Sequence, residues 1–211
     1  MIYVYAIGDR QASTGAEVDA IAHGEVAAFV KRDVARAPAP DRDSLLQHDS
    51  VVFSLMDGGG AVLPMRFGSV VGEEGELREL LTQRRDDLER RLEHVRGRVE
   101  FGVRATWRSP RPVAEDAPNG HAFMLAKLRA RSAARWQLEE LTAPLAELAI
   151  DTKVSLCPSD DTAFSTAYLV DRAHASRFEQ RARRAAGGAD EVTLALSGPW
   201  PPYSFSGSLD G

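Results

Sequence analysis

The feature that most constrains the fold is a change of hydrophobic period at Gly97. Before it, apolar residues recur at helical spacing within residues 74–96. After it, apolar and polar residues alternate through residues 99–107, which is the pattern of a half-buried strand. A long charged helix that ends at a glycine and leads into such a strand predicts a fold of the α+β class. The helical stripe consists of Leu77, Leu81, Leu88, Leu92 and Val95.

Other segments extend this mixture of elements. Residues 10–20 are predicted as a loop, and Asp43 or Ser44 as the cap of a helix that stops at Gly58-Gly59-Gly60. Pro144 is expected to kink or interrupt the longest later helix. The predicted strands cover residues 2–7, 25–31, 61–68, 154–156, 164–170 and 192–196, and a short helix runs from Ala175 to Ala185. The apolar positions of the other two helices are Leu45, Leu46, Val52, Phe53 and Met56, and Phe123, Leu128, Leu138, Leu141, Leu145 and Leu148.

Spacing and composition divide the chain into two α+β domains. Residues 108–120 contain three prolines and no apolar period, so we predict a linker there between a domain at 1–107 and a domain at 121–211. The second half reads helix, strand, strand, helix, strand. If the 99–107 strand joins it, the order becomes β-α-β-β-α-β, that of a ferredoxin-like fold. The sequence leaves open which sheet that strand joins.

Charge and cysteine content exclude several classes of protein. The 211 residues include 44% hydrophobic and 27% charged residues, the profile of a globular chain. The net charge of −5 gives no general attraction to nucleic acid or to an anionic membrane, so we expect neither as a partner. A single cysteine excludes a disulfide framework and a cysteine-rich zinc site. The start lacks a signal-peptide pattern and no apolar run is long enough to span a membrane, so we expect a cytoplasmic protein.

No set of residues points to catalysis, a cofactor or a metal. The five histidines are not paired at the spacing of helical metal ligands. The Gly68–Gly72 run has its serine at the wrong position for a nucleophile elbow, and Cys157 is best explained as a small, partly buried thiol. Glu100, in the middle of the alternating strand, is expected to form an ion pair with Arg66 or Arg104. We therefore predict no catalytic, cofactor-binding or metal-binding residue.

Two segments are not explained by packing alone. Pro64 has no N–H to donate, so the 61–68 strand is predicted to lie at a sheet edge or to begin beyond Pro64. The segment 198–205 holds three prolines and three aromatic residues, which suits either a clamp onto its own fold or a recognition surface. We favour the clamp, because aromatic rings mostly pack within their own chain. The candidate protein-binding residues are Leu63, Pro64, Met65, Arg66 and Phe67, and the candidate structural or recognition residues of the tail are Trp200, Pro201, Pro202, Tyr203 and Phe205.

Four motifs together carry a resemblance to a known family. They are Leu-Pro-Met-Arg-Phe-Gly-Ser-Val-Val (63–71), Gly-Arg-Val-Glu-Phe-Gly-Val-Arg-Ala (97–105), Tyr-Leu-Val-Asp-Arg (168–172) and Gly-Pro-Trp-Pro-Pro-Tyr-Ser-Phe (198–205). In this order, and over most of the chain, the sequence resembles the gas vesicle proteins GvpF and GvpL. We describe it as GvpF-like, although the motifs leave the choice between the two branches open.

The resemblance implies a non-enzymatic accessory or minor structural protein of gas vesicle assembly, with two α+β domains of which the first is a modified ferredoxin-like domain. It also implies binding to the hydrophobic gas vesicle shell protein and to other accessory proteins, and a location at the gas vesicle. We hypothesise that the edge near Pro64–Gly68 docks a shell subunit by strand addition or apolar packing.

Two further expectations follow from the sequence. If the tail is a clamp, Trp200→Ala is expected to lower the free energy of unfolding by about 3–5 kcal/mol. The alternative to the gas vesicle function is a small-molecule-binding enzyme on a ferredoxin-like scaffold. Such an enzyme needs a pocket with convergent polar groups and a perturbed titratable residue.

Overall fold

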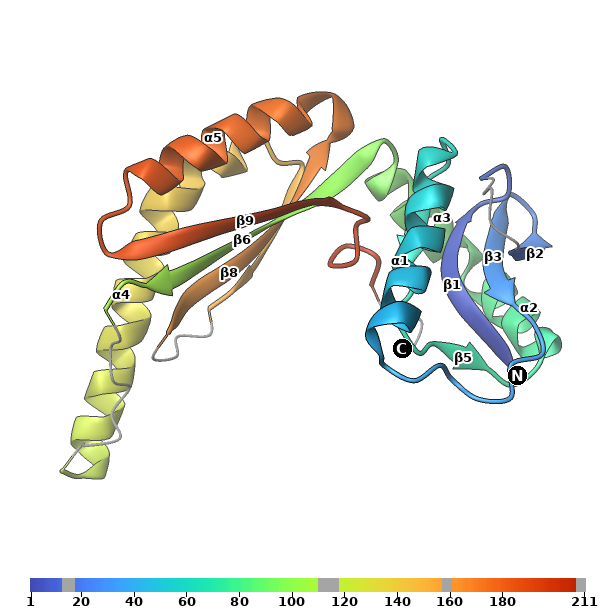
Figure 1. Ribbon diagram of the computed structural model, residues 1–211, viewed down its shortest axis with the longest axis horizontal. Coiled ribbons are helices and arrows are strands. Elements are labelled where there is room, and N and C mark those ends of the chain that lie inside the picture. The colour runs from blue at the N-terminus through green and yellow to red at the C-terminus, as the bar shows by residue number, and fades with distance from the viewer. Residues whose placement is uncertain (13–17, 110–117, 157–160, 208–211) are drawn as a thin grey trace. The chain divides into compact units, whose positions relative to one another are not determined.

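The computed structural model describes residues 1–12, 18–109, 118–156 and 161–207 (Figure 1). These residues form a mixed α+β structure with two antiparallel sheets and five α-helices. The chain divides into two compact units. The first unit is Met1–Arg98 together with Trp200–Gly211, and the second is Val99–Pro199.

The sheet of the first unit has the strand order β2-β3-β1-β4, and β5 also pairs with β1. Its central strand β1 is buried over nearly its whole length, because strands pair on both of its edges and helices cover it. The bounds of these strands are β1 Ile2–Asp9, β2 Asp19–His23, β3 Val26–Lys31, β4 Val62–Pro64 and β5 Val70–Val71.

Strand β2 corrects the end of the loop predicted over residues 10–20, whereas residues 10–12 and 18 lie outside helices and strands as predicted. It begins at Asp19 and pairs residue by residue with β3, Ile21 lying opposite Ala28. Only Ile21 of its five residues is fully buried, so the segment has no alternating apolar pattern that a sequence reading can detect. Its strand conformation depends on its neighbour β3.

Three helices belong to the first unit: α1 (Arg42–Asp57), α2 (Glu74–Gln83) and α3 (Arg85–Val95). The cap of α1 is Asp41, whose carboxylate accepts the Ser44 N–H at 2.8 Å, instead of the predicted Asp43 or Ser44. The helix predicted over 74–96 is interrupted at Arg84. The leucine stripe continues through this break, so the hydrophobic period gives no sign of it.

The core-facing side of α1 also differs from the prediction. The structure buries His48, Val51, Val52 and Leu55, which recur at helical spacing. Of the predicted apolar positions, Val52 is buried, while Leu45 and Leu46 are exposed. The buried stripe is therefore displaced from the predicted one, and it includes a histidine.

The second unit contains a four-stranded sheet with the order β7-β8-β6-β9. Helices α4 and α5 pack on each other and on β8. In the core, the ring of Phe101 stacks on Phe178 with centroids 4.9 Å apart, and Tyr168 lies 5.1 Å from Phe178. The bounds are β6 Arg98–Trp107, α4 Gly120–Ala146, β7 Asp151–Ser155, β8 Thr162–Asp171, the 3₁₀ turn η1 Arg172–His174, α5 Ala175–Gly187 and β9 Val192–Trp200.

The position of β6 corrects our domain boundary. This strand lies between β8 and β9, so it belongs to the second sheet and not to a domain at 1–107. The units separate between Arg98 and Val99, and the chain from Trp200 onward returns to the first unit. Most of the predicted linker 108–120, namely 110–117, lies outside the described residues, and α4 begins at Gly120. An alternating pattern identifies a strand, but it does not specify the partner with which the strand pairs.

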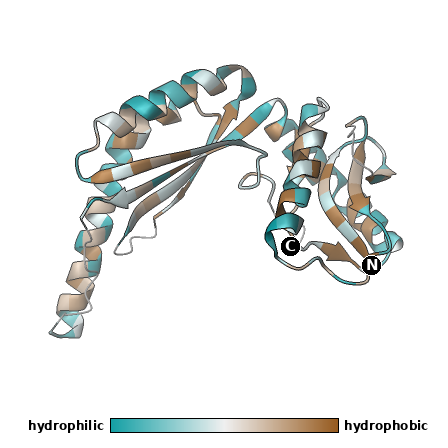
Figure 2. Cartoon of the chain, viewed as in Figure 1, coloured by the Kyte–Doolittle hydropathy of each residue, from teal (hydrophilic) through white to brown (hydrophobic). Residues whose placement is uncertain are grey.

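Helix α4 departs from prediction at both ends. Pro144 lies in its last turn, so the helix continues for only two residues beyond it. At the other end, Phe123 and Leu128 were expected in the core and are exposed, whereas Leu138, Leu141 and Leu145 are buried as predicted. The ribbon of α4 accordingly carries brown, hydrophobic stretches along the part that extends beyond the sheet (Figure 2).

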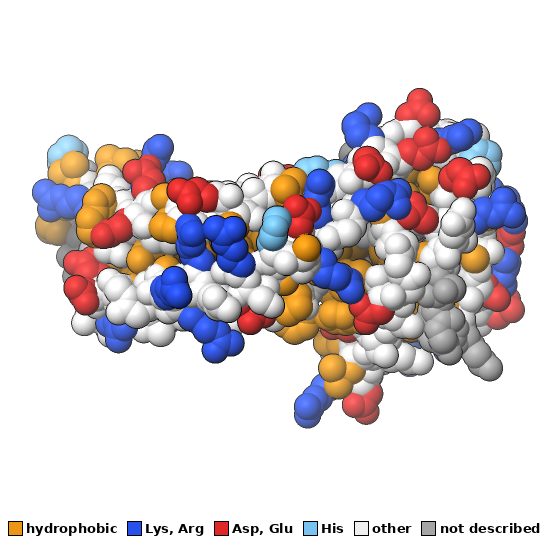
Figure 3. All heavy atoms as spheres, turned by 90° about the horizontal axis from the view of Figure 1, so that it is seen from above, with side chains coloured by type: hydrophobic (Ala, Val, Ile, Leu, Met, Phe, Trp, Pro, Cys, Tyr) orange, Lys and Arg blue, Asp and Glu red, His pale blue; other side chains and the backbone are white. Residues whose placement is uncertain are grey.

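Charged side chains of both signs cover much of the remaining surface, as the face in Figure 3 shows. On α3, Arg85 pairs with Glu89 and Arg91 with Asp87, as the spacing of four residues predicts. Arg90 also pairs with Asp87, at a spacing of three residues. No helix in the described ranges is long and apolar enough to cross a membrane.

Candidate functional site

The two sequence segments that resisted a packing explanation meet in the first unit, around His48 of α1. The imidazole is 2% exposed and lies among four aromatic rings. Tyr5 stacks on it at 5.6 Å, while Tyr3 and Phe67 approach edge-on at 5.7 and 5.8 Å. Tyr203 of the tail lies 6.4 Å away. We call Tyr3, Tyr5, His48, Phe67 and Tyr203 the His48 cluster.

Hydrogen bonds attach the 65–68 loop to this cluster. His48 Nε2 lies 3.0 Å from the Met65 carbonyl oxygen, which can only accept, so Nε2 carries the proton. Nδ1 then accepts from the Tyr3 hydroxyl at 2.7 Å. The Gly68 N–H donates in turn to Tyr3 Oη at 3.4 Å. His48 and Tyr3 therefore fix the loop at both of its ends, Met65 and Gly68.

Burial sets the charge state of these groups. It lowers the pKa of His48 below its usual value, and this effect outweighs the hydrogen bond to Met65. Burial likewise raises the pKa of the Tyr3 and Tyr5 hydroxyls. At neutral pH the cluster is therefore uncharged, and each of its hydrogen bonds has a fixed donor and a fixed acceptor.

The tail closes over the same cluster. The Tyr203 hydroxyl donates to Asp49 Oδ1 at 2.8 Å, and burial together with this bond raises the Tyr203 pKa. Pro201, Pro202 and Phe205 are buried. Trp200 packs edge-on against Phe53 with centroids 6.0 Å apart, but 44% of its surface stays exposed. The residues after Trp200 thus contribute to the core of the first unit.

The predicted protein-binding residues fall into two groups. Leu63 and Pro64 are buried, and β4, which contains them, stands at the end of the strand order, as the missing N–H of Pro64 predicts. Met65 and Phe67 are half-buried, and Arg66 is exposed. Of the predicted segment 63–67, only Met65, Arg66 and Phe67 therefore have surface that a partner protein can contact.

His48 and Asp49 are the residues that the sequence reading did not identify. His48 has a signal in hindsight, because Val51, Val52 and Leu55 follow it at helical spacing and place it on the buried face. Asp49 has none, since its role depends on Tyr203, 154 residues away.

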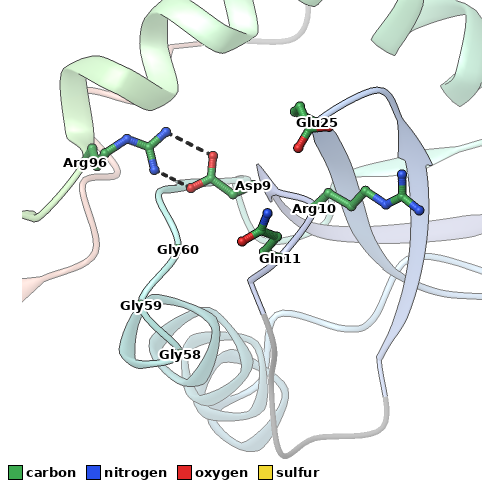
Figure 4. A pocket seen from close by; sticks show the side chains of 8 residues that line it. All are labelled: Asp9, Arg10, Gln11, Glu25, Gly58, Gly59, Gly60 and Arg96. Carbon is green, nitrogen blue, oxygen red and sulfur yellow. Dashed lines mark hydrogen bonds and ion pairs between the residues drawn. The ribbon is translucent and has the colours of Figure 1, made fainter.

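A polar pocket of about 410 Å³ lies elsewhere in the first unit (Figure 4). Arg96 Nη1 and Nη2 bind Asp9 Oδ2 and Oδ1 at 2.5 and 3.1 Å, and the Ala61 N–H also donates to Asp9 at 2.8 Å. Burial raises the pKa of Asp9, but these hydrogen bonds outweigh it and hold the pKa below its usual value. The pocket is lined by Asp9, Arg10, Gln11, Glu25, Gly58, Gly59, Gly60 and Arg96.

This pocket does not supply what the enzyme alternative requires. Its two residues with shifted pKa values, Asp9 and Arg96, are partners in one bidentate ion pair, so the shift reflects their pairing. The described residues also contain no group of three His, Cys, Asp or Glu side chains placed to hold a metal ion. Cys157 lies outside them.

The buried His48 predicts a pH-dependent stability. Its pKa is lower in the folded protein than in the unfolded chain, so the unfolded chain takes up a proton first as the pH falls below about 6.5. The melting temperature is therefore expected to fall between pH 7.5 and 5.5, and to fall less in His48→Gln. The difference between the two plots of melting temperature against pH isolates the contribution of His48, because all other groups titrate in both proteins. Two parallel curves would contradict the assignment.

Comparison with known proteins places the chain in a family. The model of the family described as "Gas vesicle synthesis protein GvpL/GvpF" matches residues 1–207. Gas vesicle protein L of Streptomyces sp. (strain CB03234) is 30% identical over 192 residues, covering 78% of this chain and 69% of that protein. Gas vesicle protein F2 of Halobacterium salinarum is 26% identical over 216 residues, covering 97% and 91%.

A solved structure agrees with this placement. The crystal structure of the gas vesicle protein GvpF from Anabaena sp. PCC7120 superposes with a TM-score of 0.81, covering 98% of this chain and 96% of that one. At 19% identity this match shows the fold. With the family match along nearly its whole length, the chain belongs to the GvpL/GvpF family of gas vesicle synthesis proteins.

Proposed function

We propose that this protein is a non-enzymatic accessory or minor structural protein that acts in the cytoplasm at the growing gas vesicle and binds the hydrophobic shell protein. Family membership supports a role in gas vesicle assembly. The observation that carries the binding proposal is a loop with half-buried apolar side chains and a fixed backbone. A shell protein exposes apolar surface before it polymerises, and a partner that covers this surface prevents aggregation.

The proposed docking surface consists of Met65, Arg66, Phe67, Val70 and Val71. Arg66 is exposed and the other four are half-buried. The backbone is held by Met65 N–H to Tyr5 O (2.9 Å), Ser69 N–H to Arg66 O (3.1 Å) and the contacts of His48. A rigid loop loses little conformational entropy on binding, which favours affinity.

Between the two docking modes, apolar packing is better supported than strand addition. β4 has only three residues and ends at Pro64, so its free edge offers a short ladder that lacks one N–H. The side chains of Met65 and Phe67, by contrast, retain accessible apolar surface next to the Arg66 cation. We therefore place the shell protein against these side chains.

The test is a pull-down of the shell protein by the full-length chain carrying Arg66→Glu and Phe67→Ser. We expect at least a tenfold loss of affinity, since a charge reversal and the removal of a central ring both act at the contact. Arg177→Glu, an exposed change on α5, is the matched charge control and should bind normally. Melting curves of all proteins exclude a folding defect, and Arg66→Glu alone leaves the His48 cluster unchanged. Normal binding by the double variant would refute the surface.

We propose further that the second unit is ferredoxin-like. Its elements run β-α-β-β-α-β, and the first and last strands are neighbours in the sheet order β7-β8-β6-β9, both of which suit that fold. The first unit departs from this fold, since β3, β4 and β5 all pair with β1 and β2 adds to β3, which suits a modified version. Other gas vesicle accessory proteins complete the set of proposed partners.

A further inference from the structure

Helix α4 exposes a row of large apolar side chains. Met124, Leu125, Leu128 and Trp136 are all exposed, with 56% of the surface of Leu128 and 59% of Trp136 accessible. In Figure 1 this part of α4 extends past the strands of its own unit. Single exposed leucines are common on proteins, but several large apolar residues exposed on one helix, here these four together with Phe123, are not. We call these four residues the α4 outer stripe.

Helical spacing places the outer stripe on one side of α4. Leu128 follows Leu125 by three residues and Met124 by four, and Trp136 follows Leu125 by eleven, or close to three turns. The residues that α4 buries against its own unit, Leu138, Leu141 and Leu145, point to another side. α4 therefore has two apolar faces, of which its own fold uses one.

The same segment carries charge of one sign. Residues 120–138 contain four cationic residues and no Asp or Glu. With a net charge of −5 for the chain and +4 for this segment, the remaining residues carry −9. The four cations are Lys127, Arg129, Arg131 and Arg135.

Two of these cations have contacts within the chain. The Lys127 ammonium lies 4.8 Å from the centre of the Phe123 ring, and Arg135 Nε binds Glu139 at 2.9 Å. Both members of the Arg135–Glu139 pair are strongly exposed, so the pair is worth at most about 1 kcal/mol and can exchange for another carboxylate. The cationic character of the segment remains available to a partner.

We propose that the α4 outer stripe docks an acidic amphipathic helix of a partner protein. An apolar stripe flanked by cations is complementary to a helix with an apolar stripe flanked by carboxylates. A second copy of α4 would place its four cations against the four cations of the first, and like charges repel. An anionic bilayer suits the surface less well, because the residues outside this segment carry a net charge of −9, whereas a helix contacts α4 alone. The surface lies in the second unit and shares no residue with the proposed shell-protein surface.

The probe for this surface is a fluorescein-labelled synthetic peptide of 21 residues, with Leu at the a and d positions of three heptads and Glu at e and g. Fluorescence anisotropy with the full-length protein is expected to give micromolar binding that weakens at least tenfold between 50 and 500 mM NaCl. The same peptide with Lys in place of Glu should not bind.

Variants locate the binding on α4. Leu128→Ser combined with Trp136→Ser, and separately Arg129→Glu combined with Arg131→Glu, should each reduce affinity at least tenfold. Leu46→Ser is the matched control, because Leu46 is as exposed as Leu128 but lies on α1, and it should leave affinity unchanged. All positions changed are exposed, so the variants should fold.

Several results would overturn the proposal. Equal binding of the Lys peptide, or normal binding by both pairs of variants, would show that the stripe is not the contact. A dimer of the wild type that Leu128→Ser dissociates in sedimentation would make a second copy the occupant. Co-sedimentation with vesicles containing 30% phosphatidylserine, without peptide binding, would make it a membrane. Tighter peptide binding after Glu115→Lys and Asp116→Lys would make it the chain's own 110–117 segment.

Discussion

Replacing Phe205 with alanine is expected to lower the free energy of unfolding by about 3–5 kcal/mol, the usual range for a buried phenylalanine. Phe205 is 6% exposed, and its backbone N–H donates to Pro202 O at 3.0 Å, so the ring is held in a turn of the tail. Urea denaturation followed by circular dichroism measures the change, with the slope used to check that the extent of unfolding is unaltered.

Trp200→Ala is the comparison variant, because it shows which residues of the tail stabilise the first unit. The sequence predicted a loss of about 3–5 kcal/mol for this change, but nearly half of Trp200 lies in water, so we now expect about 1 kcal/mol. The clamp is therefore formed by the residues after Trp200, including the Tyr203 bond to Asp49. Equal losses for both variants, or an unchanged midpoint for Phe205→Ala, would contradict this account.

Phe101→Ala is the second change for which we expect a loss of about 3–5 kcal/mol. Phe101 is fully buried on β6 and stacks on Phe178 of α5. Hydrogen exchange should accelerate in β7 and β8, which lie in the same sheet, and much less in β1 and β3. If the strand had belonged to a domain at 1–107, the faster exchange would appear in β1 and β3.

Phe29→Ala is the reciprocal control for Phe101→Ala. Phe29 is 3% exposed and lies on β3 in the core of the first unit, where it neighbours Tyr5 and Leu55 in one cluster. Its replacement should accelerate exchange in β1 and β3 first. The same exchange pattern in both variants would mean that the two units unfold as one cooperative body.

Elements with a strong local period were predictable from the sequence. The alternation of β6 and the leucine stripe of α2 and α3 each depend on which residues are apolar, and this is visible along the chain. The partner of β6 was not predictable, because β8 and β9 follow it by more than fifty residues and nothing local encodes that pairing. β2 was missed for the same reason, since it owes its conformation to β3.

The candidate site was predictable in its segments but not in its centre. The 63–67 and 200–205 segments stood out through their prolines and aromatic residues, and the structure brings Phe67 and Tyr203 to the same histidine. The sequence assigned His48 no ligand role, because no second histidine lies three or four residues from it. Burial creates the hydrogen-bond network of this histidine, by removing water from His48 and Tyr3 until they must bond each other.

The return of the chain from Trp200 to the first unit makes the second unit an insertion within the first. During synthesis on a ribosome, residues 1–98 emerge early but lack Phe205 and Tyr203 until the second unit has been translated. The nascent first unit must therefore wait, with its aromatic cluster uncovered, while about a hundred residues of the second unit are made and fold. A chain whose synthesis stops within the second unit would carry a first unit that lacks Tyr203 and Phe205.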